Sequence, residues 1–167
     1  MYVKLYIMKK ILIPLCLVIT SLCGFAQSKG DLAAGINLGV APLLESGVKV
    51  TNFGIGAKVQ YNVSNPVRLE ADLEYWFKDK GLDVFDIAAN VHYILPIRSK
   101  LHVYPLAGIG YARVGLDDFS VNRFLFNLGA GAEYEITSNI SAGFEIKYQF
   151  LKHFNRLPIS IGTTYHF

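Results

Sequence analysis

Cysteine is nearly absent from this sequence. The two cysteines present, Cys16 and Cys23, both lie near the N-terminus. Neither is expected to carry a lipid, because the bulky Leu22 precedes Cys23 where a lipoprotein signal needs a small residue. If residues 1–26 are removed, as argued below, the remaining chain has no thiol. Disulfides and cysteine catalysis are then excluded for that chain.

Long apolar runs and charged residues are also scarce. Hydrophobic residues make up 52% of the chain and charged residues only 17%. Only the stretch from Ile11 to Leu22 is continuously apolar, and elsewhere apolar and polar residues alternate. We find no metal-ligand spacing, phosphate-binding loop or nucleic-acid motif, so no cofactor and no nucleic-acid partner are predicted. A soluble enzyme of this size seldom exposes so much aromatic and aliphatic surface.

The N-terminal segment has the features of an export signal. Lys9 and Lys10 precede the apolar stretch, and Gly24 and Ala26 supply small residues before Gln27. This pattern predicts a cleaved signal peptide at residues 1–26 and a mature domain at 27–167. The alternative is a transmembrane anchor, but the apolar stretch is short for a helix that needs about 20 residues. Translation could begin at Met1 or at Met8.

Removal of this segment would change the charge of the protein. The formal net charge of the whole sequence is +3. Residues 1–26 contain Lys4, Lys9 and Lys10 and no acidic residue, so the mature chain would carry no net charge. The basic isoelectric point therefore gives no indication of a nucleic-acid partner.

From Gly30 onward the dominant period of the sequence is two, which is typical of strands with two different faces. In residues 67–77, Leu69, Leu73 and Tyr75 alternate with charged residues. Similar alternation of about ten residues predicts eight strands, close to the length that lets a tilted strand cross a bilayer. The predicted strands are 31–40, 53–63, 67–77, 85–95, 101–114, 124–135, 140–150 and 157–167.

The predicted connectors alternate in length along the chain. Short connectors (64–66, 96–100 and 137–139) alternate with longer ones (41–52, 78–84, 115–123 and 151–156). Transmembrane β-barrels have short periplasmic turns and longer extracellular loops. The sequence therefore predicts an all-β fold, an eight-stranded antiparallel up-and-down transmembrane β-barrel with its N-terminus on the periplasmic side.

The aromatic residues on the apolar faces favour the same fold. They are expected to gather near the two ends of the strands, which is the arrangement of the aromatic girdles of membrane barrels. One predicted girdle consists of Phe53, Tyr75, Phe77, Phe85, Tyr111, Phe124, Phe126, Tyr148 and Phe150, and the other of Tyr61, Tyr93, Tyr134, Tyr165 and Phe167. The alternative is a soluble lipocalin-like ligand-binding barrel, whose apolar residues would point inward.

The whole mature chain resembles the outer-membrane β-barrel domain family of Bacteroidetes-type bacteria, and more distantly the small OmpA/OmpX-type barrels. The resemblance rests on Gly24-Phe25-Ala26-Gln27, on the glycine-punctuated strand Tyr104-Pro105-Leu106-Ala107-Gly108-Ile109-Gly110-Tyr111, and on the terminal Thr163-Thr164-Tyr165-His166-Phe167. It implies a Gram-negative outer-membrane location after Sec-type export. It also implies that Phe167 is part of the signal recognised by the barrel assembly machinery. Members of the family serve as pores, adhesins, structural proteins and occasional enzymes.

The polar faces of the predicted strands place nine charged residues inside the barrel. They are Lys58, Arg68, Glu70, Asp72, Glu74, Asp86, Glu133, Glu145 and Lys147. Charges in a lumen of low dielectric constant must be paired or hydrated, or some carboxylates must keep their protons. Two interpretations follow: a hydrogen-bonded network that fills the lumen and stiffens the barrel, or a narrow porin-like path that prefers cations.

The sequence predicts a protein without enzymatic activity, whose role is structural, loop-binding (adhesin) or weakly porin-like. The enzymatic alternative is a lipid A-modifying, deacylase-like barrel with His153 as the base, but Asn155 occupies the position expected for its serine. Ser160 and Glu145 are distant substitutes. The expected partners are outer-membrane lipids and lipopolysaccharide, the phosphates of which Arg113 and Arg123 could contact. An extracellular ligand could bind the exposed loops, including 115–123.

Overall fold

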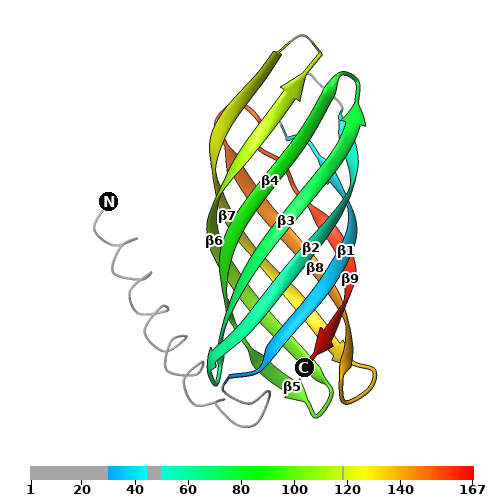
Figure 1. Ribbon diagram of the computed structural model, residues 1–167, viewed down its shortest axis with the longest axis vertical. Helices are drawn as coiled ribbons and strands as arrows, with labels where there is room; N and C mark the ends of the chain where they lie inside the picture. Colours follow the sequence, from blue (N-terminus) through cyan, green and yellow to red (C-terminus); the bar gives the residue numbers. More distant parts are fainter. Residues whose placement is uncertain (1–29, 45–49, 118) are drawn as a thin grey trace, which may run out of the picture.

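A computed structural model describes residues 30–44, 50–117 and 119–167, and these residues form a closed β-barrel (Figure 1). The predicted signal peptide, residues 1–26, lies outside the described residues. No helix within the described ranges has the length and apolar character needed to cross a membrane.

Each strand of the barrel is antiparallel to its neighbours. The strands are β1 (Leu32–Pro42), β2 (Thr51–Ser64), β3 (Val67–Asp79), β4 (Leu82–Tyr93), β5 (Leu95–Arg98), β6 (Leu101–Leu116), β7 (Phe119–Glu135), β8 (Ile140–Leu151) and β9 (Ile159–His166). β4 and β5 flank Ile94 and both pair with β6, so together they form one strand of the barrel. The pairing of β1 with β9 joins the first and last strands. The predicted eight-stranded antiparallel barrel is therefore confirmed.

The apolar faces of the strands point outward. Along β3, exposed residues such as Leu69 and Leu73 alternate with buried residues such as Glu70 and Asp72. Outward residues elsewhere are strongly exposed, including Ile109 at 69%. The soluble lipocalin-like alternative is wrong, because it requires these faces to be reversed. Because the sheet has no edges, its backbone N–H and C=O groups can be hydrogen-bonded within the barrel. Lipid, which offers no hydrogen-bond partner, then contacts only apolar side chains.

Outward aromatic side chains contact one another across neighbouring strands. The ring centroids of Phe53 and Phe77 are 6.0 Å apart, and those of Phe126 and Phe150 are 5.8 Å apart. At the C-terminal end of the barrel, Tyr165 packs edge-to-face against Phe167, with 5.1 Å between the ring centroids. The first two contacts lie within one of the two aromatic sets identified in the sequence, and the third lies within the other.

Two of the four predicted long connectors are wrong. β6 continues to Leu116 and β7 begins at Phe119, and these two residues are register partners, so most of 115–123 is strand. The predicted connector 78–84 is a tight hairpin, in which Asp79 pairs with Leu82. Lys80 and Gly81 have φ values of 47° and 85°, the left-handed conformation that a two-residue hairpin of matching twist requires.

The strand extensions bring apolar side chains into one end of the lumen. We call the end opposite the C-terminus, which carries the β3–β4 and β6–β7 hairpins, the distal end (Figure 1). Near it, inward residues form a buried cluster that we call the apolar cap. The cap consists of Ala41, Val50, Trp76, Leu82, Val84, Ala88, Ala112, Val114, Leu125 and Leu151.

The apolar cap was not predicted from the sequence. Leu82 and Val84 belong to the segment 78–84 that the sequence assigned to a loop, and Val121, which packs against the cap, belongs to 115–123. Because these segments are strands, their alternate residues face inward. The lumen therefore has an apolar distal part and a polar middle part.

The face assignment predicts the effect of a charge on the outer wall. Leu128 in β7 is 53% exposed on the apolar face. Leu128→Arg should lower the free energy of unfolding by about 2–4 kcal/mol, the cost of a cation facing the lipid midplane. Urea unfolding in lipid vesicles measures this effect. Ser120→Arg, an exposed position next to the distal hairpin, is the matched control and should have little effect. Equal stability of the Leu128→Arg variant and the native chain would contradict the assignment.

Candidate functional site: the lumenal charge network

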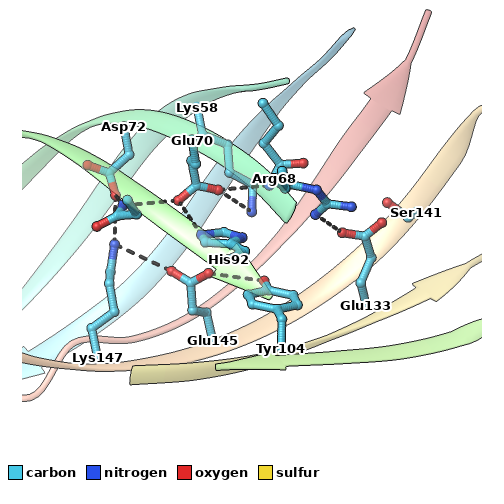
Figure 2. Close-up of polar contacts among 12 residues, drawn as sticks. Lys58, Arg68, Glu70, Asp72, His92, Tyr104, Glu133, Ser141, Glu145 and Lys147 are labelled. Atoms are coloured by element: carbon cyan, nitrogen blue, oxygen red, sulfur yellow. Dashed lines mark hydrogen bonds and ion pairs between the residues drawn. The ribbon is translucent and has the colours of Figure 1, made fainter. Parts of the chain in front are cut away.

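The nine charged residues predicted to face inward all lie in the lumen. β3 supplies Arg68, Glu70, Asp72 and Glu74 at alternate positions, and each is at most 3% exposed. The other five come from β2, β4, β7 and β8, and none is more than 6% exposed: Lys58, Asp86, Glu133, Glu145 and Lys147. We call the buried charged residues of the lumen and their polar partners the lumenal network (Figure 2).

Lys147 forms the centre of the network. Its ammonium group donates hydrogen bonds to Asp72 Oδ2 at 2.9 Å and to Glu74 Oε1 at 3.0 Å. It also lies 3.4 Å from Glu145 Oε1 on its own strand. β8 and β3 are not neighbours in the sheet, so these bonds cross the lumen and tie opposite walls together.

A second link crosses the lumen closer to the C-terminal end. Arg68 Nη1 donates to Glu133 Oε2 at 2.8 Å, which joins β3 to β7. Neighbouring Glu70 accepts a hydrogen bond from Gln60 Nε2 at 2.8 Å and lies 3.8 Å from the ammonium group of Lys58. The negative charges of Glu133 and Glu70 are therefore each partly compensated by a cation or an amide donor.

The sequence analysis missed one cation of the network. Arg156, assigned to a loop, is 2% exposed; it pairs with Asp86 and donates to Gln149 Oε1 at 2.6 Å. Its guanidinium lies 5.1 Å from the centre of the Trp76 ring, and Trp76 Nε1 donates to Asp86 at 3.2 Å. Arg156 pairs with the barrel wall through isolated β-bridges and belongs to no strand. The sequence around it therefore shows no two-residue alternation from which its inward direction could be predicted.

A histidine and a tyrosine also belong to the network. His92 and Tyr104 are buried at 0% and 2% exposure, and their rings stack with 4.5 Å between centroids. The Tyr104 hydroxyl donates to Glu145 Oε2 at 3.0 Å. Two-residue alternation from the predicted outward residues Tyr93 and Tyr111 places both residues on inward faces, but their contacts depend on strands distant in sequence.

The residues of the deacylase-like alternative are not brought together on the lipid-facing wall. His153 is exposed in the connector after β8. Ser160 and Glu145 are register partners on β9 and β8, and both are buried in the lumen. These positions do not provide the lipid-facing Ser-His-acid site that the alternative requires.

A different serine, histidine and acid do meet inside the barrel. Ser141 Oγ lies 2.9 Å from His166 Nε2, and Glu133 Oε1 lies 3.5 Å from the same nitrogen. A hydrolytic triad needs the hydroxyl and the carboxylate on different nitrogens of the imidazole, so that a proton taken from one side is balanced on the other. This arrangement therefore does not have the geometry of a triad.

Lys147 provides a test of the energetics of the network. Lys147→Met keeps the aliphatic stem and removes the cation that compensates Asp72 and Glu74. We expect the free energy of unfolding to fall by about 3–5 kcal/mol, because buried carboxylates lose their partner. Lys100→Met, in the exposed turn before β6, is the matched control. Equal urea midpoints for the two variants would show that the lumenal charges are not coupled.

Comparison with known proteins agrees with this architecture. Residues 13–167 match the family model described as outer membrane protein beta-barrel domain. Neisserial surface protein A is similar in structure, with 18% identity, coverage of 81% of this chain and 97% of that chain, and a TM-score of 0.73. Ail of Yersinia pestis has 18% identity, coverage of 83% and 99%, and a TM-score of 0.62.

The N-terminal barrel domain of Pseudomonas aeruginosa OprF has 17% identity, coverage of 84% and 100%, and a TM-score of 0.60. At these identities the similarity establishes the fold. No curated protein sequence matches the chain. The predicted resemblance to small outer-membrane barrels is confirmed, and the chain belongs to the outer membrane protein β-barrel domain family, located in the outer membrane of Gram-negative cells.

Proposed function

We propose that this protein is a non-conducting, non-enzymatic outer-membrane barrel that acts through its distal end. The observation that carries the proposal is that two groups of buried side chains fill the lumen. The apolar cap occupies the distal part, and the lumenal network occupies the middle. An eight-stranded barrel has an interior just wide enough for its own side chains.

The apolar cap opposes ion passage for a physical reason. Trp76, Val114 and Leu151 are at most 2% exposed, and an apolar constriction excludes the water that an ion needs for its hydration. Beside and below the cap, the carboxylates of the network are already bonded to Lys147, Arg68 and Arg156. These contacts favour the rigid network over the cation-preferring path.

At the distal end, two hairpins contact each other on top of the closed barrel. Lys78 and Asp117 form a 2.7 Å ion pair between the β3–β4 and β6–β7 hairpins. A Cβ at Gly81 would lie 2.3 Å from Asp117 Oδ2, so the two hairpins pack closely. Phe119 is 62% exposed beside them. Exposed groups on a rigid scaffold commonly carry binding functions.

A hollow of about 570 Å³ at this end includes Lys78 and the exposed Arg113 among its lining residues. In our proposal the distal end faces the cell exterior, and these cations contact lipopolysaccharide phosphates. Arg123, also considered from the sequence, is half-buried in β7. An extracellular ligand would bind the hairpins and the loops beside this hollow, which is the structural or adhesin-type role predicted from the sequence.

Export and assembly complete the proposal. Residues 1–26 act as a cleaved Sec signal, and Phe167 is read by the barrel assembly machinery. Phe167 is 72% exposed, and its amide donates to the Leu32 carbonyl at 2.9 Å, at the seam between the first and last strands. A terminal aromatic residue at this seam is available for recognition before the barrel closes.

Ion conductance tests the closed lumen. The folded protein in a planar lipid bilayer should show no stable channels, because the cap and the network fill the lumen. A known porin in the same bilayer is the positive control. Insertion is verified by the heat-dependent gel shift of the folded barrel. Stable cation-selective channels that weaken in Glu70→Gln or Asp72→Asn would refute the proposal and establish a pore with a carboxylate lining.

Deletion of Phe167 tests the assembly signal. The deleted chain should accumulate more slowly in the outer membrane of cells, while its spontaneous folding into detergent micelles should change little. Pulse-labelling followed by the heat-dependent gel shift measures both rates. The control is Phe124→Ala, which removes an exposed aromatic side chain far from the seam. Normal assembly without Phe167 would remove this role.

A further inference from the structure

We propose that Glu70, His92 and Glu145 form a binding site for a divalent transition-metal cation inside the barrel. One ligand atom from each residue lies within 4.8 Å of those from the other two, and all three residues are buried. They come from β3, β4 and β8 (Figure 2). The proposal goes beyond the function proposed above and does not depend on whether the lumen conducts ions.

His92 provides an independent indication of a ligand. Its side chain is 0% exposed, and neither ring nitrogen has a hydrogen-bond partner among the described residues. Nε2 points toward Glu70 Oε1 at 3.4 Å, which is an ion pair only if the imidazole is protonated. A buried polar atom without a hydrogen bond is costly, and coordination of a cation by Nε2 would remove that cost for this nitrogen.

Glu145 presents a second available atom. Its Oε2 accepts the hydrogen bond of Tyr104, while Oε1 has no hydrogen-bond partner. The nearest cation to Oε1 is Lys147 at 3.4 Å, but Lys147 makes shorter contacts with Asp72 and Glu74. Metal binding would therefore replace only the longest contact of Lys147.

Tyr104 orients two of the three ligands. Its ring stacks on His92 with an interplanar angle of 5°, and its hydroxyl holds Glu145. A Cβ at Gly131 would lie 2.4 Å from the Tyr104 ring, so only glycine leaves room for the ring in this position. Asn90 and Gln60 donate hydrogen bonds to Glu70. Such supporting contacts are typical of metal sites, where they fix the direction of the ligand atoms.

The charge balance of the lumen favours a divalent cation. The buried charged side chains include six carboxylates and four Lys or Arg residues, which sum to two negative charges when all of them are ionised. One doubly charged cation would balance them. The cations are Lys58, Arg68, Lys147 and Arg156, and the carboxylates are Glu70, Asp72, Glu74, Asp86, Glu133 and Glu145.

The ligand types define the class of metal. Imidazole favours zinc and its transition-metal neighbours, whereas calcium and magnesium take sites made of oxygen atoms. Zinc binds histidine nitrogen and carboxylate oxygen at about 2.0–2.2 Å, so two ligand atoms on one ion are at most about 4.4 Å apart. The three ligand atoms lie within 4.8 Å of one another, so side-chain rotations would have to bring them closer for one ion to reach all three. The ion would link three strands, which is a structural role.

Refolding with zinc tests the site without requiring entry into the finished barrel. The mature chain, residues 27–167, which has no cysteine to compete for the metal, is refolded from urea into detergent micelles with ZnCl₂ or with EDTA, and unbound metal is removed. Elemental mass spectrometry should find one zinc ion per folded chain, and the zinc-loaded barrel should unfold at a higher temperature than the EDTA-treated barrel. Cobalt(II) in place of zinc should give the visible absorption of a low-coordinate site.

Matched variants identify the ligands. His92→Gln and Glu145→Gln should abolish stoichiometric zinc retention and the cobalt absorption. Tyr104→Phe keeps the stacked ring and removes only the hydroxyl, so zinc affinity should fall by about 10-fold. His153→Gln and His102→Gln are the controls and should bind zinc as the native chain does. The heat-dependent gel shift confirms that each variant is folded.

Three results would overturn the proposal. The first is a folded native chain that retains no zinc. The second is equal zinc retention by His92→Gln and the native chain. The third is loss of zinc in His153→Gln, which would place the metal on the exposed loop.

Discussion

The ion pairs that cross the lumen are the interaction on which the rest of this structure depends. Arg68 and Lys147 reach from one wall to carboxylates on the opposite wall, at 2.8 Å and 2.9 Å. A charge in a lumen too narrow for bulk water must have a partner within reach. The positions of the partners therefore restrict the register and the diameter of the barrel. The apolar exterior alone would tolerate a wider range of both.

The apolar cap has a related effect at the distal end. It closes the lumen above the charges, so the lumenal network is separated from the water on that side by buried residues such as Trp76 and Leu151. Trp76 connects the two regions, because its ring packs in the cap and under Arg156 while its Nε1 bonds to Asp86. A lower dielectric constant around the pairs strengthens each of them and increases the cost of any unpaired atom. This is why the absence of a hydrogen bond at either ring nitrogen of His92 is informative.

The lumen and the distal end have different physical characters. The interior is filled by ion pairs, hydrogen bonds and apolar side chains, whereas the distal hairpins carry exposed groups and are linked by the Lys78–Asp117 ion pair. Proteins of this family share the barrel, and similarity at the identities found here extends to the fold only. The function we propose for the distal end, and the metal site in the lumen, rest on the residues of this chain.

The faces of the strands were predictable because their period is local. Two-residue alternation in segments such as 67–77 shows which side chains face lipid and which face the lumen without knowledge of any partner strand. Connectors were less predictable. Gly81 and Gly115 are equally plausible as turn residues in the sequence, but Gly81 has a φ of 85° in a hairpin and Gly115 lies within β6. The apolar cap was missed for this reason, because its Leu82 and Val84 lay in a predicted loop.

The sequence by itself determined that this chain forms an antiparallel membrane barrel with charged residues inside. That information is carried by alternation and strand length, both of which are local properties. The tertiary structure decided which charges meet. Glu70, His92 and Glu145 are separated by 22 and 53 residues along the chain and come together only when β3, β4 and β8 enclose a common lumen. Arg156 likewise becomes buried only when the barrel closes around it, because contacts across a lumen depend on closure and register rather than on spacing along one strand.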